Sequence, residues 1–293
     1  MLSPRAISFA VLAAGVAAGT AADRPHAHAP IEIGGYRVLA ADFHTHSSTW
    51  SDGALTPWGL VLEAERQGLD AIAITGHNQI SDAQLGRWFS RRIGGPTVFV
   101  GQEILAPHHH VIAVGIDRLV DWRLSVADQI DDVHRQGGIA IAAHPLPSFW
   151  PSFDQAAMQR LDGAEICHPL VFVLETGQRD LERFAARGSV AAIGSSDYHG
   201  PGPMGLCRTY VFASDASESG ILDAVRAHRT VVFGAHGQAY GDPALVTLAM
   251  NDGRLRGAPA PTSRWLNLAS QILGVLGMFG VIVGGDRRVR LSA

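Results

Sequence analysis

Two histidines and an aspartate stand directly after the first apolar run of the chain. The run Tyr36–Ala41 is typical of a buried β-strand and leads into the segment DFHTHSSTWSDG. His44 and His46 are two residues apart, so both rings point to the same side of an extended backbone. Asp52 follows, with Gly53 placed to let the chain turn. Imidazoles and carboxylates bind divalent cations, so this stretch indicates a metal site, although a surface histidine pair in a polar loop would show the same pattern.

Apolar runs and helix-like stretches alternate through the middle of the chain. The expected strands cover residues 36–41, 69–75, 97–101, 111–115, 139–143, 164–166, 190–194 and 209–212. The expected helices cover residues 57–67, 81–90, 125–136, 179–187 and 217–228. This alternation implies a parallel sheet with crossover helices, and so many units in one domain of roughly 200 residues favour a closed or distorted barrel. No G-x-G-x-x-G motif follows the first strand, so a dinucleotide-binding fold has no support.

Polar side chains recur where these strands end. The residues just past a strand end are His44, His46, His77, Glu103, His144, His168, Asp197 and His199. His110 instead stands at the start of its strand, as expected if that strand runs antiparallel as the return arm of a hairpin. In a parallel α/β barrel the carboxyl ends of the strands meet at one mouth, where active sites are built. These side chains are therefore expected to converge in one site.

Taken together, the motifs resemble those of a known family. The resemblance is to the PHP (polymerase and histidinol phosphatase) family, and it rests on HTHSSTWSDG, ITGHN, the Glu103 strand end, HVIAVGI, AAHP and GSSDYHG, over roughly residues 38–235. It implies the α/β fold of that family, a distorted (β/α)7 barrel, with two or three divalent metal ions. Carried over by position, the implied metal ligands are His44, His46, Asp52, His77, Glu103, His110, His144, Asp197 and His199.

The resemblance also implies how these ligands are shared. Glu103 is expected to bridge two ions. The first ion is expected on His44, His46 and Asp197, the second on His110 and His144, and the third on Asp52, His77 and His199. The chain departs from the family at Gly76, where many members carry an aspartate that supports a ligand. Two further histidines precede His110, so the neighbouring registers stay open.

The implied ligands offer nitrogen and oxygen but no sulfur, which suits Zn, Mn or Fe. Three divalent ions would outweigh the three ligand carboxylates, and the excess positive charge favours a phosphate dianion. A metal lowers the pKa of bound water to about 7, so a bridging hydroxide is the expected nucleophile. We therefore expect a phosphoesterase that acts on a small phosphorylated or nucleotide-like molecule. Hydrolysis of a carboxylic or carbamate ester, and a non-catalytic metal-binding module for a membrane partner, remain alternatives.

Two more residues are candidates for the reaction itself. His168 stands at the same strand-end level as the implied ligands, and we expect it to contact the substrate or to protonate the leaving group. The alternative is that this imidazole supports the ligands from behind or faces solvent, without taking part in the reaction. Arg208 follows the last ligand loop, and its guanidinium is a candidate phosphate contact. An ordinary surface arginine is the alternative there.

Composition excludes several other classes of function. All 23 basic residues are arginines, so Schiff-base and P-loop chemistry, which need a lysine amine, are excluded. The formal net charge of −4 provides no basic field for duplex nucleic acid. The two cysteines, Cys167 and Cys207, could form one disulfide in an oxidising compartment, and the sequence leaves that question open.

Both ends of the chain have the composition of membrane-targeting segments. Residues 1–22 combine Arg5, an apolar stretch and small residues, as in a signal peptide or an N-terminal anchor. Residues 265–285 carry no charge and would be long enough as a helix to cross a bilayer, with a buried hairpin or core helix as the alternative. The arginines beyond them predict a cytoplasmic tail, and therefore a membrane-anchored catalytic domain outside the cytoplasm, periplasmic or at the cell surface. The expected parts are a linker (23–35), the PHP metallohydrolase barrel (36–253), a stalk (254–264), a transmembrane helix (265–285) and a cytoplasmic basic tail (286–293).

Overall fold

The computed structural model describes residues 3–22, 30–200, 202–234, 237–255 and 264–283. The chain divides into two units, one of residues 1–26 with 259–293 and one of residues 27–258. All of the predicted site residues lie in the larger unit. The two units are described separately below.

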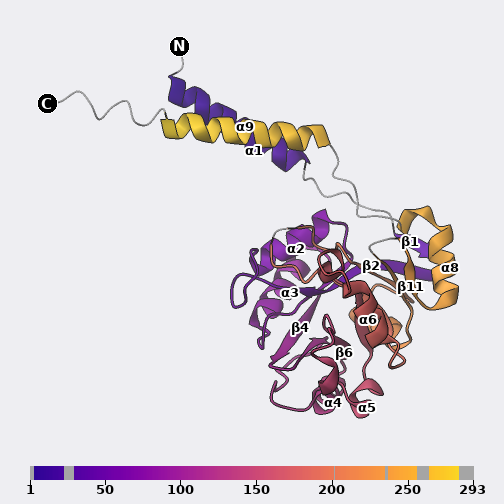
Figure 1. The fold of residues 1–293 in the computed structure, drawn as a ribbon. Helices are drawn as coiled ribbons and strands as arrows, with labels where there is room; N and C mark the ends of the chain where they lie inside the picture. The colour runs from indigo at the N-terminus through magenta and orange to yellow at the C-terminus, as the bar shows by residue number, and fades with distance from the viewer. Residues whose placement is uncertain (1–2, 23–29, 201, 235–236, 256–263, 284–293) are drawn as a thin grey trace. The chain divides into compact units, whose positions relative to one another are not determined.

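The larger unit is built on one curled sheet (Figure 1). Its strands are β1 (Ile31–Ile33), β2 (Tyr36–Thr45), β3 (Ala71–Ile74), β4 (Thr97–Ala106), β5 (His109–Val114), β6 (Ile139–Ala142), β7 (Gly163–Cys167), β8 (Ala191–Gly194), β9 (Thr209–Ala213), β10 (Thr230–Phe233) and β11 (Ala239–Gly241). They pair in the order β11-β10-β9-β2-β3-β4-β5-β6-β7-β8, with β1 beside β2. Because β10 also lies against β8 from the far end of this order, the sheet closes into a distorted α/β barrel.

The direction of the strands explains where the site forms. β2, β3 and β4 pair in parallel, as do β6, β7 and β8, whereas β5 runs antiparallel between β4 and β6. The parallel strands therefore end at the same mouth of the barrel. This α/β distorted barrel is the fold class that the sequence predicted, while β9 and β10 add antiparallel pairs that a regular alternation of β and α units does not contain.

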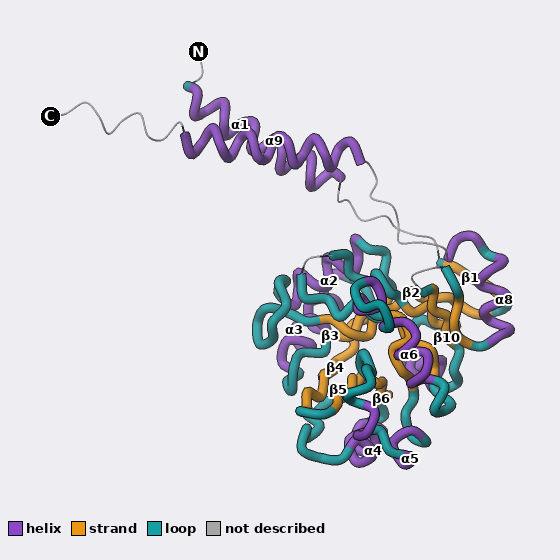
Figure 2. The backbone as a smooth tube through the Cα atoms, viewed as in Figure 1, coloured by secondary structure: helices purple, strands orange, loops and turns teal. Residues whose placement is uncertain are grey.

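Helices pack around the curled sheet (Figure 2). They are α2 (Pro57–Arg66), α3 (Ser81–Ile93), α4 (Val126–Arg135), α5 (Gln155–Met158), α6 (Gly177–Ala185), α7 (Glu218–Arg226) and α8 (Pro243–Asn251). The hydroxyls of Thr56, Ser125 and Ser217 cap α2, α4 and α7 by accepting main-chain N–H bonds, so the start predicted for α2 is confirmed. On one face α7 packs on an apolar layer that contains Phe43 and Phe99, and the other face packs against α2, α3 and α4.

Two predicted boundaries are wrong. The predicted linker 23–35 contains β1, because its apolar alternation pairs with β2 across a turn where Gly34 and Gly35 have positive φ of 61° and 82°. β4 continues to Ala106 instead of ending at Gly101, because main-chain pairing with β5 extends it through polar residues. Residues 256–263 of the predicted stalk and the predicted basic tail lie outside the described residues.

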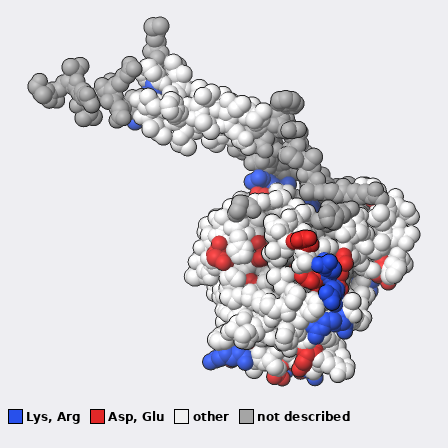
Figure 3. Space-filling view, in the orientation of Figure 1, with Lys and Arg blue, Asp and Glu red and all other residues white. Residues whose placement is uncertain are grey.

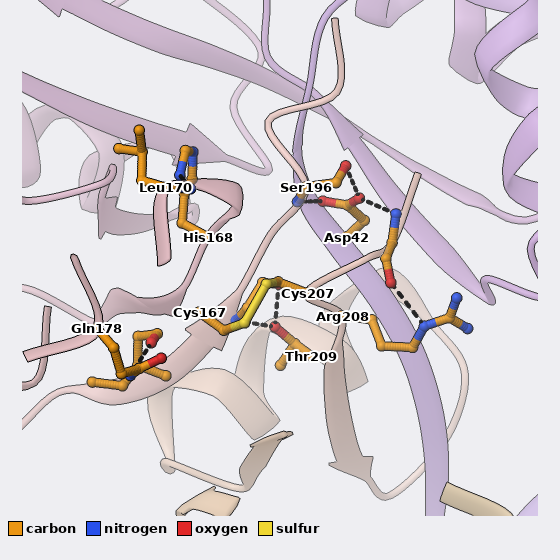
Figure 4. Close-up of a disulfide and its surroundings, with 12 residues drawn as sticks. Asp42, Cys167, His168, Leu170, Gln178, Ser196, Cys207, Arg208 and Thr209 are labelled. Atoms are coloured by element: carbon orange, nitrogen blue, oxygen red, sulfur yellow. Dashed lines mark hydrogen bonds between the residues drawn. A yellow bond between two sulfur atoms is a disulfide. The ribbon is translucent and has the colours of Figure 1, made fainter. Parts of the chain in front are cut away.

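The two cysteines form a disulfide, which settles the question that the sequence left open. Cys167 ends β7, and Cys207 lies just before β9, 40 residues further along the chain (Figure 4). Both side chains are buried. The bridge therefore fixes the end of β7 to the segment that returns to the sheet, next to His168.

The smaller unit is a pair of helices, α1 (Pro4–Ala22) and α9 (Arg264–Val283). Small residues let them approach closely: a Cβ on Gly15 would lie 2.7 Å from the main-chain nitrogen of Gly274. Among the residues that the structure describes, no helix is long and apolar enough to cross a membrane. The predicted transmembrane helix 265–285 is therefore not found among the described residues.

Candidate metal centre

The strand ends bring the predicted ligands to one mouth of the barrel. His44 lies near the end of β2, and His46 follows that strand. His77 follows β3, and a parallel bridge between His77 and Glu103 ties this loop to β4. From the other half of the sheet, His144 follows β6, and Asp197 and His199 follow β8.

The hairpin predicted for His110 is confirmed. β5 pairs antiparallel with β4 in a register that makes Glu103 and His110 diagonal neighbours on one face. Nδ1 of His110 lies 2.8 Å from Oε1 of Glu103. The neighbouring ring of His109 turns away, with Nε2 3.2 Å from the side-chain oxygen of Gln129. Of these two adjacent histidines, the register therefore brings His110 to the site.

Imidazoles and carboxylates gather here in four overlapping groups. Within each group, one nitrogen or oxygen atom from every member lies within 4.8 Å of the others. The groups are His44, His46 and Glu103; Glu103, His110 and His144; His46, Asp52, His77 and His199; and His44, His144, His168 and Asp197. All nine predicted ligands belong to these groups, and within the described part of the chain His168 is the only member outside that predicted set. The groups overlap, so the ions would be close neighbours.

Glu103 lies at the centre of the cluster and presents each oxygen to different imidazoles. Oε2 lies 3.3 Å from Nε2 of His44 and 3.4 Å from Nε2 of His46. Oε1 lies 2.8 Å from Nδ1 of His110 and 3.3 Å from Nε2 of His144. Burial by itself would raise the pKa of Glu103, but the surrounding imidazoles, His44 foremost, bring that pKa well below its usual value. The carboxylate is therefore ionised and placed to bridge two cations.

Several buried atoms in the cluster have no hydrogen-bond partner. Among the described residues they include Nε2 of His44 and His46, Nδ1 of His77 and His110, and Oδ1 of Asp197. Nδ1 of His44 lies 3.0 Å from Oε1 of Glu165, and a carboxylate can only accept, so Nδ1 carries the proton of the neutral ring. Nε2 then points its lone pair at Oδ1 of Asp197, 3.2 Å away. Two acceptors that face each other repel unless a cation lies between them, so the donor set fits divalent metal ions.

Protons and metal ions compete for this cluster. Burial would lower the pKa of His44, but Asp197, Glu103 and Glu165 together raise that pKa well above its usual value. Burial would raise the pKa of Asp197, and His44, followed by His168, lowers that pKa well below its usual value. The nitrogen and oxygen atoms that would bind a metal are thus the same atoms that bind protons when no metal is present. Metal binding must then release protons.

The third predicted ion would lie at the more open end of the cluster. The Asp52 side chain is 58% exposed, and its oxygens lie 3.3 Å from Nε2 of His77 and 3.3 Å from Nε2 of His199. Nδ1 of His199 donates to the main-chain carbonyl of Asp197 at 2.8 Å, which leaves Nε2 as the acceptor. A side chain on Gly76 would meet the Gln79 amide, so the Gln79 side chain would have to move to admit one.

Two of the predicted ligands have unusual backbone conformations. His144 has φ of 27° and Asp197 has φ of 44°, both in the left-handed region that side chains with a Cβ rarely adopt. Such a conformation costs of the order of 1–3 kcal/mol and persists only where surrounding contacts hold it. Here the His144 N–H donates to Oε2 of Glu165, and Nε2 of His168 lies 3.2 Å from Oδ2 of Asp197. Backbone strain of this kind is typical of functional sites.

His168 and Arg208, the two residues predicted to act in the reaction, have different surroundings in the structure. His168 is buried beside the cluster; its Nδ1 accepts the Leu170 N–H at 3.2 Å, so the neutral ring carries its proton on Nε2 and donates to Asp197. Arg208 is buried elsewhere, and its Nε and Nη1 donate to the main-chain carbonyls of Gly205 and Gln67 (Figure 4). These bonds join Arg208 to main-chain carbonyls, and its contact with phosphate stays a prediction.

Two buried carboxylates support the cluster and were not among the predicted residues. Glu165 in β7 contacts His44 and His144, as described above. Asp42 in β2 accepts the Ser196 N–H at 3.0 Å, the Ser196 hydroxyl at 2.5 Å and the Gly205 N–H at 2.9 Å (Figure 4). The one available signal was an acidic residue inside an otherwise apolar strand, as in GAEIC.

Comparison with known proteins supports the fold. No family model matches the chain. The chain is 26% identical over 139 residues to the uncharacterized protein MJ1587 of Methanocaldococcus jannaschii. The matched region covers 44% of this chain and 81% of that protein.

Among solved structures, the chain is similar to a two-domain protein from Bacteroides vulgatus that contains a predicted PHP-like metal-dependent phosphoesterase. The TM-score is 0.61 at 22% identity, covering 76% of this chain and 72% of that one. A weaker likeness, with a TM-score of 0.49 at 16% identity, is to PsfC of Pseudomonas syringae, over 80% of this chain and 99% of that one. The chain thus has a PHP-like fold, with buried clusters of histidine, glutamate and aspartate at the barrel mouth.

Proposed function

We propose that this protein is a metal-dependent phosphoesterase that acts on a small phosphorylated or nucleotide-like molecule, with two or three divalent ions, Zn, Mn or Fe. The observation that carries the proposal is the Glu103 carboxylate, whose two oxygens face His44 and His46 on one side and His110 and His144 on the other. A carboxylate shared in this way would hold two cations side by side, as hydrolysis at a metal pair requires.

Charge balance supports a phosphate ester as the substrate. When bound, divalent ions would polarise phosphoryl oxygens and lower the pKa of water. The cluster contains four carboxylates, namely those of Asp52, Glu103, Glu165 and Asp197. The positive charge of three divalent ions exceeds the negative charge of the four carboxylates, whereas the charge of two ions only balances it. We therefore propose that the exposed group that contains Asp52 must bind its ion before a phosphate dianion binds well.

The molecular surface supports a small substrate. On the face of the larger unit shown in Figure 3, basic side chains gather in one narrow stripe with acidic side chains beside it. A duplex nucleic acid would need a broad basic surface, because its affinity comes mainly from contacts to phosphates. The negative net charge of −4 agrees with this view.

The proposal is tested by metal analysis and a substrate panel. Purified protein should contain two or three equivalents of Zn, Mn or Fe, and chelation should abolish hydrolysis of p-nitrophenyl phosphate or bis-p-nitrophenyl phosphate until metal is returned. A naphthyl carbamate and a carboxylic ester complete the panel. Faster turnover of either of these, relative to both phosphates, would overturn the phosphoesterase assignment while leaving the metal site intact. Metal-loaded protein that hydrolyses nothing would instead indicate a binding module.

We propose that His168 holds Asp197 in place, because its Nε2–H donates to that carboxylate and its Nδ1 accepts the Leu170 N–H, which leaves no N–H for a leaving group. Leaving-group dependence tests this role against the predicted proton donation. His168→Ala should lower kcat by similar factors for p-nitrophenyl phosphate and for a phosphate ester with a poor alkyl leaving group. A loss of roughly 100-fold confined to the alkyl ester would instead show that His168 protonates the leaving group, because general acids contribute on the order of 10²–10⁴.

A further inference from the structure

The strand β7 contributes none of the predicted metal ligands, yet its one acidic side chain reaches the cluster. Glu165 is fully buried, and both of its carboxylate oxygens are engaged. Oε1 lies 3.0 Å from Nδ1 of His44, and Oε2 accepts the main-chain N–H of His144. A buried carboxylate is costly unless it is paired, so a residue of this kind at this position calls for a physical reason.

The first contact determines which nitrogen of His44 can bind a metal. A carboxylate offers no proton, so the bond requires the proton on Nδ1 and leaves Nε2 with its lone pair. Nε2 is the atom that lies 3.3 Å from Oε2 of Glu103 and 3.2 Å from Oδ1 of Asp197, with no hydrogen-bond partner. If the proton were on Nε2 instead, it would point into the place where the cation is expected. Glu165 therefore selects the tautomer that can coordinate.

The second contact acts on the backbone of a different predicted ligand. His144 has a φ of 27°, and the bond from its N–H to Glu165 holds this left-handed conformation. In that conformation Nε2 of His144 lies 3.3 Å from Oε1 of Glu103. His44 and His144 belong to the two groups that share Glu103, so one carboxylate orients an imidazole in each of them.

We propose that Glu165 is a positioning residue that sets the tautomer of His44 and the backbone of His144, and so determines the affinity of both Glu103-bridged metal positions. This inference rests on the proposed function only in taking the cluster as a metal site. Carboxylates that orient ligating imidazoles commonly change metal affinity or activity by about 10–100-fold when they are removed.

The test is Glu165→Gln in the full chain, with Zn²⁺ as the probe. Glutamine keeps the shape and can still accept the His144 N–H, but its amide N–H then faces His44 and favours the wrong tautomer. We expect Zn²⁺ affinity, measured by competition with a chromophoric chelator, to fall about 10–100-fold at one or both tight positions. In Glu165→Asp the Zn²⁺ affinity should fall less, because the aspartate carboxylate can still accept the Nδ1–H of His44. Glu182→Gln is the matched control, since this glutamate accepts a bond from Tyr240 away from the cluster.

A spectroscopic readout separates positioning from general structural support. Long-range ¹H–¹⁵N NMR of the Zn²⁺-loaded wild type, with His44 assigned by substitution, should show Nδ1–H and a metal-bound Nε2. Unchanged Zn²⁺ affinity in a folded Glu165→Gln, or Nε2–H on His44 in the wild type, would overturn the proposal, and the second measurement stands even if the variant does not fold. Phosphoesterase activity enters neither measurement, so failure of the proposed function would be seen separately, as Zn²⁺ binding without turnover.

Discussion

Glu103→Gln should abolish hydrolysis and most metal binding. The substitution removes the negative charge that faces five imidazoles, those of His44, His46, His77, His110 and His144. It also replaces one acceptor oxygen with an N–H₂ group that would point at a cation. Stabilisation of transition-state charge by metal ions is worth several kcal/mol, so kcat/KM for the best phosphate ester should fall by at least about 10³-fold. Bound metal, measured after dialysis, should fall by at least one equivalent.

The control for this result is Glu175→Gln. Glu175 is exposed in the loop after β7, so this change removes the same charge at a distance from the cluster. It should leave both the metal content and the rate unchanged. Full metal content with wild-type turnover in Glu103→Gln would mean that Glu103 is not the bridging group, and the whole metal-pair proposal would then fall.

The predicted ligands could be found from the sequence because their signals are local. The i, i+2 spacing of His44 and His46 on an extended segment, and the position of His144 and Asp197 just past apolar runs, require no knowledge of distant contacts. Parallel strand pairing then brings such positions together without further information. The structure adds that they share Glu103, and the spacing alone could not show which oxygen faces which ring.

The supporting residues could not be predicted in this way, because their partners are remote in sequence. Glu165 meets His44 across 121 positions, and Asp42 meets Ser196 across 154. No local pattern records a pair of this kind. Arg208 was predicted to contact phosphate from its position beside a ligand loop, and the structure adds that its side chain donates to main-chain carbonyl groups. The direction of a side chain at a loop depends on packing that periodicity does not reveal.

Short elements were also missed, for a different reason. β1 and β11 contain three residues each, too few for an apolar alternation to be recognised. β4 was predicted too short because Gln102 and Glu103 interrupt its apolar run. The apolar pattern stops where the site begins, because Glu103 is a site residue. The end of the pattern therefore marks a functional position and not the end of the strand.

Asp42→Ala should produce the largest loss of stability among the buried polar residues around the site. Asp42 is fully buried and joins β2 to the loop that carries Asp197 and to the turn at Gly205. Burial raises the pKa of this carboxyl, and its bonds to Ser196 partly offset that effect. Alanine would leave the N–H groups of Ser196 and Gly205 without an acceptor, at about 1–3 kcal/mol each, so we expect a loss of about 4 kcal/mol in the free energy of unfolding.

Urea unfolding of the metal-free and metal-loaded forms measures this effect. Asp42→Asn keeps one acceptor oxygen and should lose clearly less than Asp42→Ala, because fewer donors are left unpaired. Asp121→Ala is the control, since Asp121 makes an exposed pair with Arg123 and should leave the midpoint unchanged. Because Asp42 also bonds the segment that places Asp197, the alanine variant should gain less stability from added Zn²⁺ than the wild type does. Equal gains would show that Asp42 stabilises the barrel without shaping the metal site.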